Sequence, residues 1–180
     1  TIEKDKQMTM DFKTDGATVY LIGEMVDDIS CSEYLYSYKG IKLSHAPYFD
    51  IDKEANMQKA LSDLINQGII ESAHDVSEGG LFIAMLESAM CRNLGFELYT
   101  SGEIRLDSFL FGEGQGRVVV TVKAGKENDF IDMLNISNVP CCAVGSVRAD
   151  GVIMVDEEVF GKVSDFKTVY DNAIGDVLDK

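Results

Sequence analysis

The sequence has no tryptophan, two prolines and two histidines among its 180 residues. Its four cysteines, at positions 31, 91, 141 and 142, lack the Cys-x-x-Cys spacing of the usual zinc sites. Two of them are adjacent, and neighbouring cysteines rarely form a disulfide with each other, so we expect reduced thiols and a cytoplasmic protein. No apolar run reaches the roughly 18 residues that a membrane-spanning helix needs.

Positive charge is also scarce, with 16 lysines and arginines against 31 aspartates and glutamates and a formal net charge of −15. Nonspecific binding to nucleic acid needs a basic field, and so does binding to an anionic membrane surface. We therefore expect neither partner. A phosphorylated small molecule remains compatible with this charge, because a helix N-terminus and a single arginine act locally.

Length and composition predict one large domain, since 46% of the residues are hydrophobic. Residues 1–16 are polar and charged, and we interpret them as a linker or N-terminal arm from a preceding domain. Residues 17–180 are predicted to form a single α/β domain. Because the first residue is Thr1 rather than methionine, we expect a piece cut from a longer polypeptide.

Hydrophobic periodicity predicts a mixed β-sheet with helices packed on its faces. An Asp-Gly pair at 150–151 predicts a hairpin between the last two strands. Residues 27–38 are interpreted as a polar loop with aromatic side chains, and residues 101–111 remain unassigned. Strands are predicted over residues 18–23, 69–73, 96–99, 117–123, 140–147 and 152–155, and helices over 52–67, 80–93, 126–134 and 164–178.

The first candidate site follows the second predicted strand, where residues 73–81 read Ala-His-Asp-Val-Ser-Glu-Gly-Gly-Leu. Gly79 and Gly80 would let the backbone approach a phosphate or ribose, and Ser77 could cap the following helix. Asp75 and Glu78 could hold Mg²⁺ or accept hydrogen bonds from hydroxyls. The alternative is a capped helix whose glycines merely bring it close to the sheet. His74 in this segment fits a structural role better than that of a base.

The second candidate site is residues 111–117, Phe-Gly-Glu-Gly-Gln-Gly-Arg. Glu113, Gln115 and Arg117 alternate, so in an extended segment they project to one side, with Gly114 leaving space. Arg117 could then fork onto a phosphate or carboxylate. The alternative is a flexible glycine loop with an exposed Arg–Glu pair. Neither segment holds a nucleophile–base pair, which favours ligand binding over a complete catalytic apparatus. We name no catalytic residue and no dedicated metal site.

These two segments in this order, together with Ser-Glu-Tyr at 32–34, resemble the C-terminal domain of the aminoimidazole-ribonucleotide-synthetase-related superfamily. Within it, the resemblance is to formylglycinamidine ribonucleotide synthases and spans about residues 17–156. It implies a parent enzyme that uses ATP and Mg²⁺ to activate a ribotide amide, and ammonia from a glutaminase to form an amidine. It also implies that the catalytic residues lie in absent domains of the same polypeptide, with a glutaminase and small accessory subunits as further partners.

Two departures from the family pattern stand out. Ser30-Cys31 replaces a glycine pair before Ser32, and glycines 114 and 116 stand where the family often has serine. Two alternatives stay open. One is a sister enzyme, such as aminoimidazole ribonucleotide synthetase, selenophosphate synthetase or thiamine-phosphate kinase; the other is a structural nucleotide-site or assembly module. Every ligand-binding version requires the two glycine-containing bends to converge in space.

Overall fold

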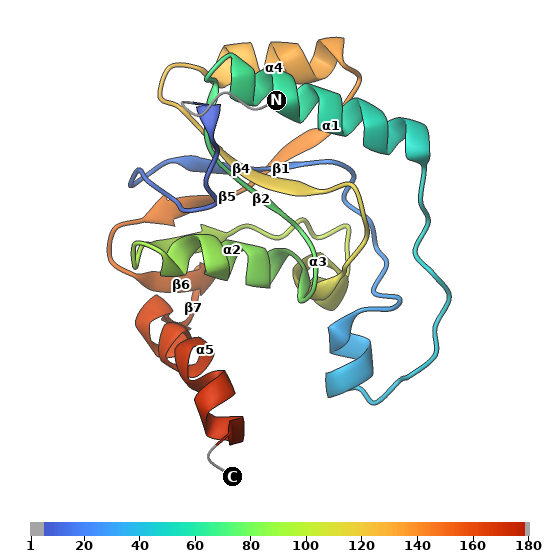
Figure 1. Cartoon of the computed structure of the whole chain (residues 1–180), viewed down its shortest axis with the longest axis vertical. Coiled ribbons are helices and arrows are strands. Elements are labelled where there is room, and N and C mark those ends of the chain that lie inside the picture. Colours follow the sequence, from blue (N-terminus) through green and yellow to red (C-terminus); the bar gives the residue numbers. More distant parts are fainter. Residues whose placement is uncertain (1–5, 179–180) are drawn as a thin grey trace.

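A computed structural model describes residues 6–178 and has one seven-stranded sheet in the order β2-β4-β1-β5-β3-β6-β7 (Figure 1). Neighbouring strands are antiparallel except for the parallel pair β3–β6. The strands are β1 (Thr18–Ile22), β2 (Ile70–Asp75), β3 (Gly95–Leu98), β4 (Val118–Val122), β5 (Cys141–Arg148), β6 (Val152–Val155) and β7 (Glu158–Lys162). The helices are η2 (a π-helix, Tyr34–Tyr38), α1 (Ile51–Asn66), α2 (Gly80–Met90), α3 (Leu106–Phe111), α4 (Glu127–Ile136) and α5 (Val163–Leu178).

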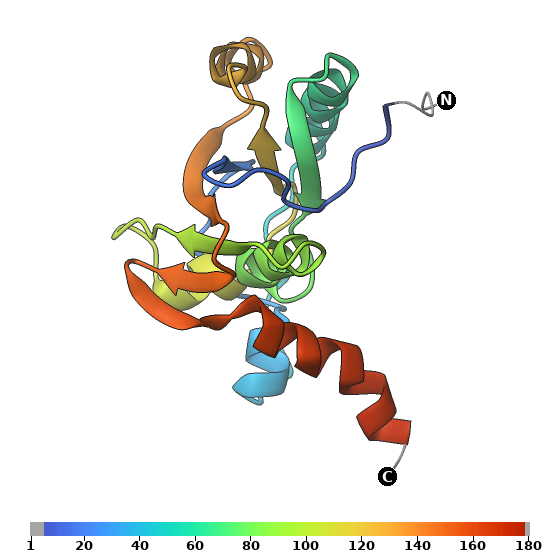
Figure 2. The same ribbon diagram turned by 90° about the vertical axis from the view of Figure 1, so that its left-hand side faces the viewer.

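Helices cover both faces of the sheet and create two hydrophobic cores. Figure 2 shows α1 and α4 on one side and α2 on the other. Strand β4 serves both cores, because Val119 packs with the α2 side while Val118, Val120 and Val122 pack with the α1 and α4 side. All five β4 residues are buried, which confirms the central strand predicted from the valine run. The predicted mixed α/β sheet is confirmed.

The predicted hairpin between β5 and β6 is wrong. Strand β3 lies between them, antiparallel to β5 and parallel to β6. The hairpin instead joins β6 to β7 through Asp156 and Glu157, whose φ values of 48° and 69° form a tight turn of the kind that suits antiparallel strands. Asp-Glu is not a favoured pair at such a turn, whereas Asp-Gly is, so local sequence preference selected the wrong turn.

Three elements, η2, α3 and β7, are absent from the sequence prediction. Helix α3 is only six residues long, and it is stabilised by Phe109 and Leu110 in the α2-side core rather than by a periodic stripe. Strand β7 is an edge strand with Val159 and Phe160 exposed, so it lacks the burial alternation that predicts strands. Helix α5 is confirmed, but its predicted apolar face is largely exposed and the helix projects from the body (Figure 2).

The segment before β1 lies against the domain. The Ala73 N–H donates to the Thr9 carbonyl at 3.1 Å, and the Phe12 N–H donates to the Ser88 carbonyl at 3.1 Å. The Phe12 side chain is 1% exposed and belongs to the α2-side core. The described part of the predicted arm is therefore packed, while the domain boundary at residue 17 stays a prediction. Residues 1–5 of the arm lie outside the described residues.

Asp11 in this arm forms an ion pair with Arg92, with 2.5 Å between Asp11 Oδ2 and Arg92 Nε. Partial burial raises the pKa of Asp11, but hydrogen bonds with Thr9 and Arg92 and the charges of Lys13 and Arg92 outweigh it and lower the pKa to about 2. Because the folded pKa lies below the unfolded value near 3.8, the stabilisation is complete above about pH 5 and lost toward pH 2.

We therefore expect Asp11→Asn to lower the free energy of unfolding at pH 6 by up to about 1 kcal/mol, because the exposed arginine is screened by solvent. The difference from wild type should shrink as the pH falls from 4 to 2. Urea unfolding at a series of pH values measures it. A difference that stays constant across this range would contradict the assignment.

None of the helices within residues 6–178 combines the length and apolar character required to cross a membrane. All four cysteines are free thiols.

Candidate functional site

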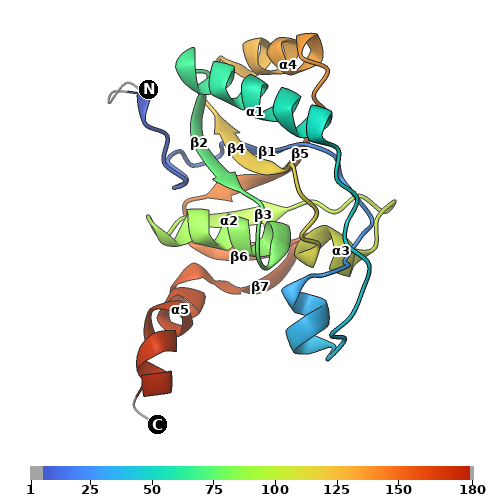
Figure 3. The same ribbon diagram turned by 45° about the vertical axis from the view of Figure 1, so that its right-hand side comes forward.

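The two glycine-containing bends converge, as the ligand hypothesis requires. A single carboxylate oxygen, Oε1 of Glu113, accepts a hydrogen bond from the Gly79 N–H at 2.8 Å and another from the Glu33 N–H at 2.8 Å. Three segments that lie 34 to 80 residues apart along the chain therefore meet at one carboxylate. We call this meeting point the Glu113 junction. Figure 3 shows α2, α3 and η2 approaching one another in this region.

The start of α2 differs from the prediction. Ser77 does not cap the helix; the N-cap is Gly79, with φ of 81°, which has no side chain of its own to accept from the first turn. Gly80 has φ of 70°, and a Cβ there would lie 2.7 Å from the Phe111 backbone. The glycine pair is thus required for a close approach, but the approach is to the 111–112 backbone of the same chain. The glycines therefore allow close packing, as the structural alternative predicted, and this packing brings together the segments that the ligand hypothesis requires to converge.

Glu113 occupies a position that an external anion was expected to fill. A helix N-terminus attracts negative charge because its first N–H groups lack partners within the helix. Here the Gly79 N–H is satisfied by the Glu113 carboxylate. A ligand that uses this N–H must displace a carboxylate of the same chain, so the donor is not freely available to a phosphate.

The predicted alternation of Glu113, Gln115 and Arg117 along one extended face is wrong, because residues 112–117 form a loop. Arg117 is 5% exposed, and its guanidinium donates from Nε to the Gly114 carbonyl at 2.8 Å and from Nη2 to the Gly112 carbonyl at 2.6 Å. Burial lowers the pKa of Arg117, and the nearby Glu113 charge opposes this. Arg117 therefore fixes the loop that carries Glu113 instead of forking onto a ligand.

Asp75 ends β2 with its side chain 76% exposed, 3.5 Å from His74 Nδ1. The other ring nitrogen of His74 lies 2.8 Å from Glu87 Oε2, which supports its structural reading. Among residues 6–178, no three histidine, cysteine, aspartate or glutamate side chains cluster closely enough to hold a metal ion. Asp75 and Glu78 therefore do not belong to any such three-residue cluster among the described residues.

Two cavities flank the 112–117 loop, and each is lined by some of the predicted ligand-binding residues. The first, which we call the junction cavity, has a volume of about 500 Å³, and Glu78 and Glu113 line it. The second, the α1 cavity, has a volume of about 520 Å³ and is lined by Gly114, Gln115 and the start of α1. Ligand pockets typically span about 300 to 1,000 Å³, so both are large enough for a small molecule. Ser32, Glu33, Lys42 and Ser44 also line the junction cavity.

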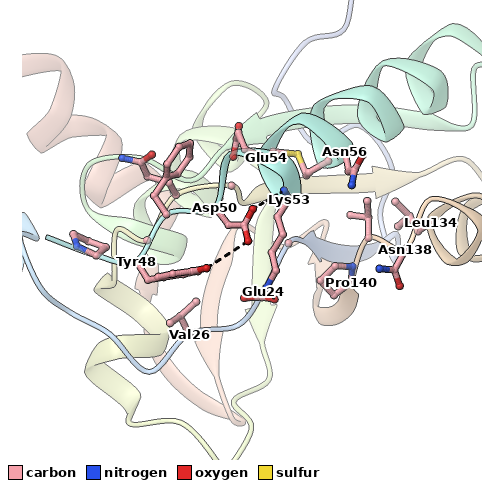
Figure 4. A pocket seen from close by; sticks show the side chains of 18 of the residues that line it. Glu24, Val26, Tyr48, Asp50, Lys53, Glu54, Asn56, Leu134, Asn138 and Pro140 are labelled. Atoms are coloured by element: carbon pink, nitrogen blue, oxygen red, sulfur yellow. Dashed lines mark hydrogen bonds and ion pairs between the residues drawn. The ribbon is translucent and has the colours of Figure 1, made fainter.

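The side chains that dominate the α1 cavity were missed by sequence reasoning. Asp50 caps α1 by accepting from the Asp52 and Lys53 N–H groups at 3.0 and 3.1 Å. Lys53 Nζ lies 2.6 Å from Glu24 Oε1, and this hydrogen bond raises the pKa of Lys53. Figure 4 shows these side chains with Glu54 and Tyr48 around the cavity. An aspartate before an apolar stripe signals a helix start, but no sequence signal brings Glu24 beside it.

Cys31 adopts φ of 56°, a left-handed conformation that favours glycine. Its N–H donates to Ser44 Oγ at 2.7 Å, which ties the loop before η2 to the segment that precedes α1. At Cys31 the backbone thus has a positive φ of the kind that glycine adopts readily, and the Cys31 residue lines the junction cavity.

Comparison with known proteins gives a consistent result. The family model described as AIR synthase related protein, C-terminal domain, matches residues 14–156. "Phosphoribosylformylglycinamidine synthase subunit PurL" of Caldanaerobacter subterraneus is 34% identical over 149 residues, covering 83% of this chain and 20% of the relative. The protein of the same name from Carboxydothermus hydrogenoformans is 31% identical over 169 residues, covering 92% and 23%. The chain thus spans about a fifth of the length of these relatives.

Solved structures with the same fold include Thermotoga maritima PurL complexed with FGAR, at a TM-score of 0.76 and 18% identity, covering 89% of this chain and 29% of that one. T. maritima PurL complexed with ATP follows at 0.71 and 18%, covering 91% and 27%. Thiamine-monophosphate kinase from Stenotrophomonas maltophilia reaches 0.56 and 16%, covering 87% and 55%. At these identities the likeness concerns the fold alone.

Proposed function

The chain belongs to the AIR synthase related protein, C-terminal domain family, and from this premise we propose that it is such a domain of a PurL-type phosphoribosylformylglycinamidine synthase. The parent reaction is the ATP- and glutamine-dependent conversion of formylglycinamide ribonucleotide to the amidine. Relatives at 30 to 34% identity that all bear this name support the proposal over the sister enzymes. The T. maritima neighbours complexed with ATP and FGAR support these two ligands for the parent.

In this proposal the chain supplies one wall of the ligand-binding site, and the catalytic groups come from other domains of the parent. ATP and Mg²⁺ are assigned to the parent protein, and the T. maritima neighbour complexed with ATP supports the nucleotide. The fold neighbour PurLQS from T. maritima supports a separate glutaminase and a small accessory subunit as partners. The isolated domain is then inactive.

The observation that carries the proposal is the pair of hydrogen bonds at the Glu113 junction. They join the Ser-Glu-Tyr segment, the start of α2 and the 112–117 loop, which are the three motifs of the family resemblance. We propose that Glu78, Gly79, Gly80 and Glu113 form the ligand-facing wall on the junction side. Gly114 and Gln115 face the other side of the loop, where they line the α1 cavity, and we leave them out of this wall.

Variants of Glu113 in the full-length protein test the proposal. Glu113→Ala removes the acceptor of two charge-assisted hydrogen bonds, so we expect the KM for the ribotide to rise about tenfold or more. Glu113→Gln keeps the shape and one acceptor oxygen and should show a smaller effect. Amidine formation with ammonium as the nitrogen source measures the change without needing a glutaminase.

Glu158→Gln, an exposed carboxylate on β7, is the matched control and should leave the KM unchanged. Thermal melts establish that the Glu113 variants fold. If the full-length protein forms no amidine, the enzymatic assignment is wrong. If it does and folded Glu113→Ala retains the wild-type KM, the assignment stands but the junction has no role in ligand binding.

A further inference from the structure

The α1 cavity carries an inference that does not depend on the proposed function. Its volume of about 520 Å³ lies between the first turns of α1, the 114–116 loop and the end of α4. Figure 4 shows Tyr48 and Val26 on one side and Asn138 and Pro140 on the other, with Lys53 reaching toward Glu24 between them. The cavity therefore has an aromatic and apolar wall around a charged centre.

The charge of this centre excludes phosphorylated ligands. Four carboxylates line the cavity, those of Glu24, Asp28, Asp50 and Glu54, against the single ammonium of Lys53. Lys53 is already paired with Glu24 at 2.6 Å. An anion placed here would meet excess negative charge and no free cation among the lining residues, whereas a cation would be attracted.

Glu54 is the carboxylate whose negative charge is least compensated. Its Oε1 accepts from Gln58 Nε2 at 2.7 Å, but its Oε2 is shielded from solvent and has no hydrogen-bond partner within residues 6–178. Asp50 differs, since one of its oxygens accepts the two N–H groups at the start of α1. A desolvated carboxylate oxygen without a donor is costly, and a positive charge placed in the adjacent cavity would lower that cost.

The remaining lining fits an aliphatic body. Met57, Leu134, Val139 and Pro140 offer apolar contacts, and the amides of Asn56 and Asn138 offer neutral hydrogen-bonding groups. Tyr48 is exposed at the rim, where its ring face can attract an ammonium group. Carboxylates, an aromatic face and apolar contacts together are the chemistry that recognises an amine on a methylene chain.

We propose that the α1 cavity binds a small aliphatic amine cation, with an ammonium group beside Glu54 and its methylene chain along the apolar wall. Putrescine, with two ammonium groups on a four-carbon chain, is the probe. Two molecules of similar length serve as matched controls: 1,4-butanediol, which is uncharged, and succinate, which carries the opposite charge.

Isothermal titration calorimetry on the full-length protein tests the proposal. We expect putrescine to bind and both control molecules to give no saturable heat. Glu54→Gln removes the uncompensated charge and should raise the Kd for putrescine about tenfold or more. Asn56→Lys adds an ammonium to the cavity wall from an exposed position and should weaken binding without altering Glu54. Glu158→Gln, which removes the same charge from β7, should leave the Kd unchanged.

Glu54→Gln removes a negative charge and Asn56→Lys adds a positive one, so the test still holds if one of them fails to fold. Thermal melts show whether each variant is folded. The proposal is overturned if wild type fails to bind putrescine at millimolar concentration, or if folded Glu54→Gln binds it as tightly as Glu158→Gln does. Binding of 1,4-butanediol with equal affinity would show an apolar pocket without charge selectivity. Preferential binding of succinate would show an anion site, and either result overturns the proposal.

Discussion

Arg117→Ala is expected to lower the free energy of unfolding by about 3 kcal/mol or more, because two buried carbonyl groups then lack a hydrogen-bond donor. The guanidinium donates to the Gly112 and Gly114 carbonyls, which belong to the loop that holds Glu113. Its removal also opens a void next to the 5%-exposed side chain. Loss of loop order should extend to the Glu113 hydrogen bonds at the junction.

Urea unfolding of the variant against wild type measures this effect. Arg105→Ala is the matched control, because Arg105 pairs with Asp107 at 2.6 Å while remaining 62% exposed. An exposed ion pair of this kind contributes at most about 1 kcal/mol. Arg117→Met adds a second comparison, since it restores apolar volume but supplies no donor. Equal costs for Arg117→Ala and Arg105→Ala would show that Arg117 does not fix the loop.

Gly80→Ala is expected to be the second large effect, at about 3 kcal/mol or more, because it combines backbone strain with a backbone clash. The new Cβ would lie 2.7 Å from the Phe111 Cα and 2.8 Å from the Gly112 carbonyl oxygen. Neither contact can be relieved by rotating a side chain. The start of α2 must therefore separate from the 111–112 backbone, which pulls Gly79 away from Glu113.

Gly125→Ala separates the two contributions. Gly125 has φ of 78°, close to the 70° of Gly80, but a Cβ there meets nothing within 4 Å. It should cost only the strain of a left-handed residue, about 1 kcal/mol. Thermal or urea unfolding of both variants gives the difference, which reports the clash alone. If Gly80→Ala costs no more than Gly125→Ala, the close approach at the junction is incorrect.

The sequence predicted those elements whose pattern lies within one continuous segment, and it missed those that depend on contacts with distant segments. The β4 strand and helix α1 were predicted because their burial patterns extend over many consecutive residues. The β6–β7 hairpin was missed because its turn uses Asp156 and Glu157, and the position of β3 between β5 and β6 was missed because strand order is not encoded locally. The residues between 101 and 111 become helical at α3 through contacts with α2.

At the site, too, the sequence predicted the local features and missed those that depend on contacts between distant segments. The glycine-containing segments were identified from sequence because backbone close approach leaves a glycine signature, and their convergence is confirmed. In the structure the Gly79 N–H donates to Glu113 of the same chain, and a ligand at this position stays a prediction. Ser77 and Arg117 were assigned roles that they do not have, because capping geometry and burial depend on the path of the loop.

The sequence by itself determined the family of this protein, its mixed α/β class, the central valine strand and the segments that form the junction. The family follows from the resemblance of the motif residues, and the other features follow from hydrophobic periodicity and the special conformations of glycine. Tertiary structure alone decided which groups face each other: Glu113 toward Gly79 and Glu33, Arg117 toward its own loop, and Glu24 toward Lys53. Hydrogen bonds and charge pairs act over a few ångströms between residues tens of positions apart, and only the folded chain sets those distances.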